Sequence, residues 1–323
     1  MSQVSGAQRD SSWRDTLREY TVEAMLFVVL IIAVVIMAQL SPAFLSTRNL
    51  FNIIRFTAEI GIISLGMTAV ILTGGIDLSV GSILGMCGIV MGALFTAGMN
   101  IWLAALIALA AGTAAGALNG FVITRTGVHS LVVTLATLAI YRGVALGISQ
   151  GDSYRGFPEA FFTLGQGYVG PVPVQLLIFA LLAVTFGLLL SRTTFGRSIY
   201  AFGHNKLASR FSGLRVDRLE LVVFTLSGFL SAVAAVIFVS RVSSARGDAG
   251  QLVELDVITA VVLGGTALTG GRGTIWGTLL GLLIIGVVRN GLTLAFVPLE
   301  VQAVFVGLIL IAAVAVNQRL RQL

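Results

Sequence analysis

Charged residues are scarce in this chain, and that scarcity excludes a soluble protein. Only 11% of the 323 residues are charged, whereas 57% are hydrophobic and the mean hydropathy is +0.99. Soluble globular domains usually carry about 25% charged residues. Apolar stretches of roughly 17 to 22 residues recur along the chain, and each is long enough to cross the hydrocarbon core of a bilayer. The composition therefore predicts one polytopic helical membrane domain.

Cysteine, histidine and lysine are almost absent, which removes most kinds of reactive site. The single cysteine, Cys87, permits neither a disulfide nor a thiolate metal cluster within the chain. The two histidines, His129 and His204, lie in separate segments, so neither a zinc site nor a Cys–His nucleophile is expected. The only lysine, Lys206, does not belong to a phosphate-binding GxxxxGK motif. We expect no catalytic residue, no bound metal and no ATPase site in this chain.

Ten apolar stretches predict an all-α bundle of about ten transmembrane helices. Their approximate ranges are 24–40, 59–73, 80–98, 101–122, 130–148, 174–191, 219–240, 257–270, 275–296 and 300–316. The first run could imitate a signal peptide, but no small-x-small cleavage pattern follows it, so we interpret it as an uncleaved first helix. The predicted parts are a cytoplasmic N-terminal segment, a single membrane domain and a cytoplasmic tail, over 1–23, 24–316 and 317–323.

The distribution of basic residues predicts the orientation. With the N-terminus in the cytoplasm, ten crossings also place there the C-terminus and the loops at 123–129, 192–218 and 271–274. Thirteen of the twenty basic residues then fall on the cytoplasmic side, as the positive-inside rule expects. The net charge of +6 could suggest a nucleic-acid partner, but the basic residues are spread over short loops. Membrane lipid, and no nucleic acid, is therefore expected around the chain.

A short glycine-containing motif occurs twice in the sequence. The triplet TGG stands at 73–75 and again at 269–271, and further glycines follow each triplet at the same two spacings. Paired glycine interruptions in the two halves of a transporter point to its pathway. An alternative stays open, in which both triplets are tight cytoplasmic turns that precede glycine-rich packing helices; the two interpretations are compatible. The candidate pathway residues are Gly74, Gly75, Gly270 and Gly271.

Other small residues recur at four-residue spacing, which lets helix backbones approach closely in lipid. We expect internal helix packing from these glycines and keep a dimer interface as the alternative. They are Gly112, Gly116 and Gly120, then Gly88 and Gly92, then Gly143 and Gly147.

Asp77 is the one acidic residue placed deep among apolar residues. Ionisable groups in such surroundings are costly and usually face a cavity or a partner, which makes Asp77 and the nearby Ser79 candidate pathway residues. The alternative is structural: Asp77 could cap the helix that begins near Ser79.

Three arginines lie within or at the ends of spans on the external half: Arg142, Arg241 and Arg289. Such side chains can snorkel to the membrane surface. They could also form a basic rim that meets acidic residues of a partner protein.

The cytoplasmic loop at 192–218 combines basic and aromatic residues. Phe195, Tyr200, Phe202 and Phe211 are interleaved with its charges, around a short helix-like segment bounded by glycines. This pattern suits a small helix that inserts into a groove of a cytosolic partner. A plain solvated basic loop is the alternative.

Three motifs resemble those of the ribose-type permeases of sugar ABC importers, which include the ribose, xylose, rhamnose and autoinducer-2 branch. They are LTGGIDLSVG at 72–81, GRSIYAFGHN at 196–205, and AVVLGG at 260–265 with GGRG at 270–273. The resemblance covers about 24–316. His204 departs from the family's pattern, in which a glycine often precedes the asparagine, so the loop is not expected to match in every detail.

The resemblance implies that two permease chains, identical or paired with a sister subunit, sit on two cytosolic ATPase modules that bind ATP and Mg²⁺. It implies that a periplasmic binding protein delivers the sugar and that the 192–218 loop is the coupling element. The implied ATPase-coupling residues are Gly196, Arg197, Tyr200, Gly203, Asn205, Ala208, Ser212 and Gly213. The candidates for docking the binding protein are Arg241, Arg246 and Asp248.

The implied function is import of a small sugar across the bacterial inner membrane by alternating access, driven by ATP hydrolysis on the partner. Family members serve pentoses, hexoses, deoxyhexoses and a sugar-like autoinducer, and the sequence leaves the choice open. The main alternative is an ion-coupled secondary carrier, which should carry several acids or histidines at midplane, where only Asp77 qualifies. An intramembrane enzyme should show a paired acid, a metal cluster or a nucleophile with its base.

Overall fold

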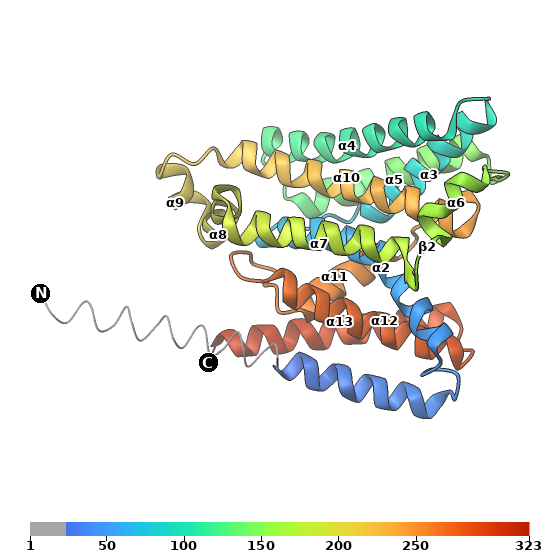
Figure 1. Cartoon of the computed structure of the whole chain (residues 1–323). Coiled ribbons are helices and arrows are strands. Elements are labelled where there is room, and N and C mark those ends of the chain that lie inside the picture. The colour runs from blue at the N-terminus through green and yellow to red at the C-terminus, as the bar shows by residue number, and fades with distance from the viewer. Residues whose placement is uncertain (1–23, 323) are drawn as a thin grey trace, which may run out of the picture.

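The computed structural model describes residues 24–322, and this part of the chain is almost entirely helical (Figure 1). An apolar helix, Ala24–Leu40, comes first. The helices after it are α2 (Thr47–Leu72), α3 (Val80–Thr96), α4 (Ile101–Thr126), α5 (Ser130–Ser149), α6 (Glu159–Gln166), α7 (Val174–Arg192), α8 (Thr194–His204), α9 (Lys206–Phe211), α10 (Val216–Val242), α11 (Val253–Leu263), α12 (Ile275–Leu294) and α13 (Leu299–Gln322). Short strands form two ribbons, β1 (Ser153–Tyr154) with β4 (Ala245–Arg246) and β2 (Tyr168–Val169) with β3 (Val172–Pro173).

Polar residues beside the apolar runs set where the helices begin and end. The Ser46 hydroxyl accepts a hydrogen bond from the backbone N–H of Asn49 at the start of α2, and Asn100 caps α4 in the same way. α4 ends at Gly127, whose φ of 70° lies in the left-handed region that glycine favours. Between such caps a helix satisfies its own backbone, as a lipid environment requires.

Six helices are long and apolar enough to cross a bilayer, within the residues described: α2, α4, α5, α7, α10 and α12. In the most apolar 18-residue stretch of α5 only 28% of the residues are buried inside the protein, and in that of α7 only 17%. Exposed apolar faces on this scale suit lipid and not water. The prediction of an all-α polytopic membrane protein is confirmed.

Each of the ten predicted spans contains a helix, but the span at 257–270 needs correction. Its helix, α11, has 11 residues and ends at Leu263, and residues 264–274 form a loop. At about 1.5 Å per residue, α11 covers roughly half of a bilayer core about 30 Å thick. The apolar pattern continued past the helix because the loop residues at 264–268 are themselves buried or half-buried.

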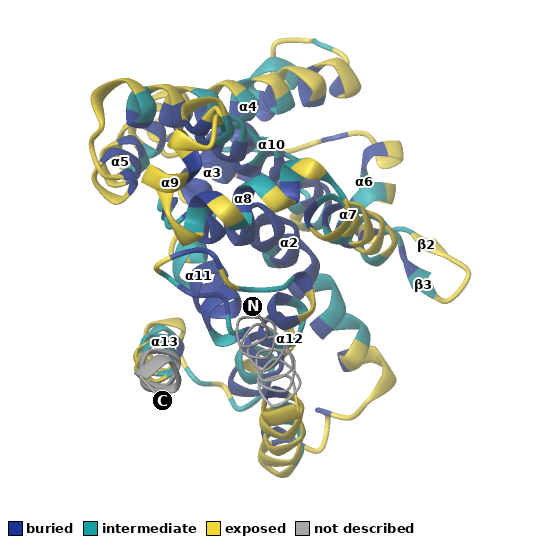
Figure 2. Ribbon diagram, turned by 90° about the vertical axis from the view of Figure 1, so that its left-hand side faces the viewer, coloured by how far each residue is buried: buried dark blue, intermediate teal, exposed yellow. Residues whose placement is uncertain are grey.

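The centre of the bundle is formed by α2 and α10, where Ile62, Leu65 and Phe224 are fully buried. Figure 2 shows the buried residues gathered along these helices and α3, with exposed residues on the outer helices. α4 packs closely along α10, because a Cβ on Gly116 would collide with the Phe224 carbonyl and lie 2.9 Å from the Cα of Gly228. Internal packing is therefore confirmed for the 112–120 glycines.

The glycines of α5 behave differently. A Cβ on Gly143 or Gly147 would meet nothing within 4 Å, and both residues are exposed. The prediction of internal packing is wrong for this pair, since no helix of the described chain covers that face. The alternative, a dimer interface, stays a prediction.

The helices run between two ends of the bundle (Figure 1). One end carries α8 and α9, and the helix Ala24–Leu40 begins there while α13 finishes there. The opposite end carries α6 and the β2–β3 ribbon. We call these the α8–α9 end and the α6 end.

Candidate functional site at the meeting of two glycine turns

The two TGG triplets, 196 residues apart in the chain, meet in space at the α8–α9 end. α2 stops at Leu72, and Gly74 follows with a φ of +77°; Gly270 and Gly271 have φ values of +84° and +77°. The N–H of Gly271 donates to the Leu72 carbonyl at 2.9 Å, and a Cβ on Gly270 would lie 2.8 Å from the backbone nitrogen of Gly74. Both triplets are tight turns, as the alternative interpretation held, and the two turns touch each other.

The carboxyl end of α8 closes this junction. A Cβ on Gly203 would collide with the Leu72 carbonyl oxygen and with the backbone nitrogen of Gly271. One turn earlier in α8, the Tyr200 hydroxyl donates to the Gly273 carbonyl at 2.9 Å. One short helix therefore contacts both glycine turns directly, and only a glycine at position 203 allows that approach.

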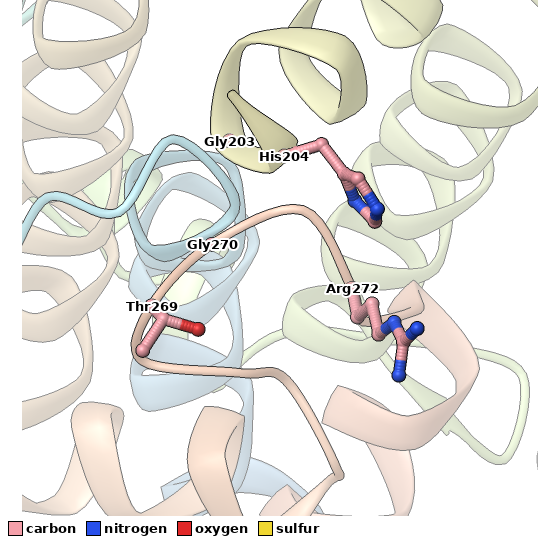
Figure 3. A pocket seen from close by; sticks show the side chains of 5 residues that line it. All are labelled: Gly203, His204, Thr269, Gly270 and Arg272. Atoms are coloured by element: carbon pink, nitrogen blue, oxygen red, sulfur yellow. The ribbon is translucent and has the colours of Figure 1, made fainter. Parts of the chain in front are cut away.

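A depression of about 320 Å³ opens beside the junction. Gly203, His204, Thr269, Gly270 and Arg272 line it, and Figure 3 shows the His204 ring over the loop that carries Gly270 and Arg272. His204 and Arg272 are both exposed. The depression therefore opens to the surface at the α8–α9 end.

Next to the junction, α9 holds apolar side chains out to solvent. Leu207 is 64% exposed and Phe211 84% exposed. The Asn205 side chain accepts from the N–H of Ala208 at 2.9 Å and so begins α9. Ion pairs of 2.8 Å and 2.6 Å tie α9 to the start of α10; they are Lys206–Glu220 and Arg210–Asp217. A short, anchored helix with an exposed apolar face has the form of a docking element.

The remaining predicted coupling residues lie in or next to the two short helices α8 and α9. Gly196 is buried in the first turn of α8 against the Leu190 carbonyl, where Thr193 caps the helix. Ser212 donates to the carbonyl of Ala208, and Gly213 ends the segment with a φ of +85°. Arg197 is exposed. Within the described chain, the loop at 192–218 consists mainly of two short helices.

Asp77 lies elsewhere, at the centre of a buried polar network. Its carboxylate is fully buried and accepts from the backbone N–H of Ser79 at 3.0 Å, the Ser79 hydroxyl at 2.6 Å and the Ser227 hydroxyl at 2.8 Å. Asn119 donates to the Ser79 hydroxyl at 2.8 Å, and the Tyr141 hydroxyl donates to Asn119 at 3.2 Å. The network joins α3, α4, α5 and α10, and this geometry favours the structural role that was left open for Asp77.

The sequence alone did not identify the partners of Asp77. Asn119 carries a usable signal, because an amide within an apolar run needs a hydrogen-bonding partner in lipid. Ser227 and Tyr141 carry none, since serine and tyrosine occur in many spans without meeting an acid.

The arginines of the external half are committed to internal contacts. Arg241 forms a two-bond ion pair with Glu59, at 2.7 Å and 3.0 Å, and its side chain is only 16% exposed. Arg289 pairs with Asp256 at 2.7 Å, and Arg142 donates to the carbonyls of the 247–249 segment. Neither snorkelling nor an open basic rim describes these residues. That Arg241 docks a partner stays a prediction.

Arg246 and Asp248 do lie on the surface at the α6 end. They form a two-bond pair at 2.9 Å and 2.7 Å, with side chains 58% and 47% exposed. The hydrogen bond from Arg246 lowers the pKa of the Asp248 carboxyl. Among residues 24–322, no three His, Cys, Asp or Glu side chains gather as a metal site.

Comparison with known proteins identifies the chain. A family model described as branched-chain amino acid transport system, permease component, matches residues 49–314. The chain belongs to this permease family. The permease is 41% identical over 295 residues to the ribose import permease protein RbsC of Bacillus subtilis, covering 91% of this chain and 92% of that one. It is 38% identical to the D-allose transport system permease protein AlsC of Escherichia coli over 294 residues, or 90% of each chain.

A third relative of the permease is the autoinducer 2 import system permease protein LsrD of Klebsiella pneumoniae, which is 37% identical over 298 residues and 90% of each chain. No solved structure matches the permease. The family match begins and ends within the described residues and includes both glycine turns, α8 and α9.

Proposed function

We propose that this chain is the membrane-spanning permease subunit of an ABC importer that moves a small sugar, delivered by a periplasmic binding protein, across the bacterial inner membrane. The support is similarity, over at least 90% of the chain, to import permeases for ribose, allose and autoinducer 2. The family description names branched-chain amino acids. The sugar assignment rests on the individual relatives, which match the chain over nearly its whole length.

The observation that carries the mechanism is the contact of α8 with both glycine turns. ATP hydrolysis belongs to a separate ATPase subunit, which holds ATP and Mg²⁺ and binds α9 through Leu207 and Phe211. Movement of α8 reaches the end of α2 and the loop between α11 and α12 together, since Gly203 lies against Leu72 and Gly271. Glycine turns are suited to absorb such a change, because they tolerate backbone angles that other residues do not.

In this proposal Gly74, Gly75, Gly270 and Gly271 serve as hinges of the pathway. Asp77 and Ser79 hold the bundle together, because their polar atoms are occupied within it. The chain crosses the membrane about ten times, with both termini in the cytoplasm; one of these crossings consists of the 247–252 segment, α11 and the loop after it. A second permease chain, a copy or a sister subunit, completes the pathway, and the binding protein docks at the α6 end near Arg246 and Asp248.

The test is ATP hydrolysis in proteoliposomes that contain this chain, its ATPase subunit and its binding protein. Sugar-loaded binding protein should stimulate hydrolysis. The double variant Leu207→Ser with Phe211→Ser should weaken binding of the ATPase at least about tenfold, because burying each apolar side chain contributes about 1.5 to 3 kcal/mol. Both side chains are exposed in the isolated chain, so the variant should fold normally.

Phe296→Ser is the matched control, because Phe296 is 92% exposed and lies towards the opposite end. It should leave stimulation unchanged. If Phe296→Ser lost as much of the stimulated ATP hydrolysis as the double variant, docking through α9 would be contradicted. Sugar uptake that persists without any ATPase subunit would overturn the ABC assignment and favour an ion-coupled secondary carrier.

A further inference from the structure

The segment 247–254, which joins β4 to α11, enters the bundle from the α6 end. β4 pairs with β1 just beyond the end of α5, so residue 246 still lies at the α6 end. α11 begins at Val253 and has only 11 residues, about 16 Å, before its loop reaches the junction at the other end. The start of α11 therefore lies deep in the bundle, and the 247–252 segment descends to it without helical structure.

Contacts with α3 support this depth. A Cβ on Gly81 would collide with the Gly250 carbonyl oxygen and lie 2.5 Å from the Glu254 carboxylate. Gly81 follows directly on the Asp77 network, and Asp77 bonds Ser227, which lies twelve residues into the 27-residue helix α10. Gly250 and Glu254 therefore lie near the middle of the membrane span. The glycine at position 81 supplies the space for both.

The segment is held firmly in place. Arg142 of α5 donates to the carbonyls of Gly247 and Ala249 at 2.7 Å and 2.6 Å. A Cβ on Gly85 would lie 2.7 Å from the Ala249 carbonyl oxygen. The segment therefore passes close to the backbone of α3, at a position where α3 carries no side chain. Leu252 adopts a φ of +63°, which is costly for a bulky side chain. Such a conformation persists only where the surroundings fix it.

Polar side chains on this segment remain open despite their depth. Gln251 is exposed, Leu252 is 45% exposed and Glu254 is half-buried. Irregular backbone at membrane depth does not face hydrocarbon; it is covered by protein or lines a water-filled cavity. A carboxylate and an amide at this depth also face protein or water, because they would lose their hydrogen bonds in lipid.

We propose that the 247–254 segment lines the sugar pathway and that Gln251 and Glu254 form hydrogen bonds to sugar hydroxyls in transit. Amide and carboxylate groups supply the donors and acceptors that a polyhydroxylated substrate needs. Asp77 cannot do this in the same conformation, because serine hydroxyls and a backbone N–H occupy its carboxylate. This inference rests on the proposed sugar import.

The first test asks whether Gln251 faces water. Gln251→Cys, in the reconstituted transporter during ATP turnover, is treated with a membrane-impermeant maleimide. It should be modified at least about tenfold faster than Leu181→Cys on α7, because Leu181 is 69% exposed on an apolar helix and so faces lipid. Cys87 is fully buried and gives the wild-type blank. A Gln251→Cys rate as low as that of Leu181→Cys would overturn the proposal.

The second test separates sugar contact from ATP coupling. Gln251→Leu and Glu254→Gln should each lower sugar uptake at least about tenfold, while binding-protein-stimulated ATP hydrolysis stays within about twofold of wild type. Glu300→Gln, at an exposed acid in the first turn of α13, is the control and should transport normally. Normal uptake by both variants would overturn the inference alone. Failure of the wild type to couple hydrolysis to sugar would overturn the proposed function instead.

Discussion

At the residue scale, the buried carboxylate of Asp77 is the centre of a hydrogen-bond network that joins four helices. It accepts three hydrogen bonds. The Ser79 hydroxyl also accepts from Asn119, which in turn accepts from the Tyr141 hydroxyl. A buried acceptor stabilises the fold only while its donors are present, and a donor that loses its acceptor is costly. Asp77 is therefore expected to affect stability before it affects transport.

Asp77→Ala should lower the stability of the purified chain by about 2 kcal/mol, because three buried donors lose their acceptor. Asp77→Asn should cost less, since its amide oxygen can still accept from the Ser79 N–H and serine hydroxyls can rotate to accept from the amide. The measurement is the melting temperature in detergent. An unchanged melting temperature for Asp77→Ala, together with lost sugar uptake, would instead assign Asp77 to the pathway.

The sequence alone indicated which residues were unusual, but it did not show what role each of them plays. An isolated acid in an apolar run pointed to Asp77, and the repeated TGG triplets pointed to the two turns. The role of Asp77 depends on Ser227, which is 150 residues away in the chain and has no distinguishing neighbours. The ion pair that removes Arg241 from the surface depends on Glu59, 182 residues away. Such pairings follow from helix packing and not from local pattern.

At the scale of elements, glycine spacing alone does not tell a packing face from an exposed one. Gly112, Gly116 and Gly120 lie against α10, whereas Gly143 and Gly147 of α5 meet no other helix within the described residues. Both sets show the same four-residue spacing. The difference comes from the partner helix, which the spacing does not specify.

Gly116→Ala should destabilise the chain by about 1 to 3 kcal/mol, because the added methyl group collides with the Phe224 carbonyl and separates α4 from α10. Gly143→Ala is the matched control and should be neutral or stabilising by about 0.5 to 1 kcal/mol, since alanine favours the helix and the space is open. Melting temperatures of the two variants in detergent provide the comparison. Equal destabilisation would mean that α5 packs against something in the purified chain.

Helix α8 offers a second matched pair, which tests its contact with the glycine turns. Gly203→Ala should leave ATPase docking intact, because the α9 face is untouched, but it should reduce sugar-stimulated hydrolysis at least about tenfold by pushing α8 off the Leu72 carbonyl. Gly187→Ala in α7 meets nothing within 4 Å and should behave as wild type. Full coupling in Gly203→Ala would show that the close approach at position 203 is dispensable.

Most helices could be predicted from the apolar runs, because a span long enough for the bilayer is also a continuous helix. α11 could not, since the loop after it is also apolar and buried and so continues the run past Leu263. The half-length helix, in turn, is what brings the 247–254 segment to membrane depth. The pathway position inferred there lies in a segment whose local sequence is that of an ordinary polar loop.

At the scale of the whole molecule, exposed basic residues are concentrated at one end. Eight of them lie at the α8–α9 end: Arg125, Arg192, Arg197, Lys206, Arg210, Arg215, Arg218 and Arg272. Three lie at the α6 end: Arg48, Arg155 and Arg246. Arg55, Arg142, Arg241 and Arg289 are engaged with partners within the chain. The asymmetry favours a cytoplasmic α8–α9 end.

Four glycines in loops between the helices allow this orientation to be measured: Gly98, Gly127, Gly170 and Gly213. A reporter that is active only in the periplasm, fused after each of them in turn, should be active at Gly98 and Gly170 and inactive at Gly127 and Gly213. Ten crossings require this alternation, and a fusion after α13 should also be inactive. Activity at Gly213 would place α9 outside the cell, where no ATPase could bind it, and the coupling proposal would fail together with the orientation.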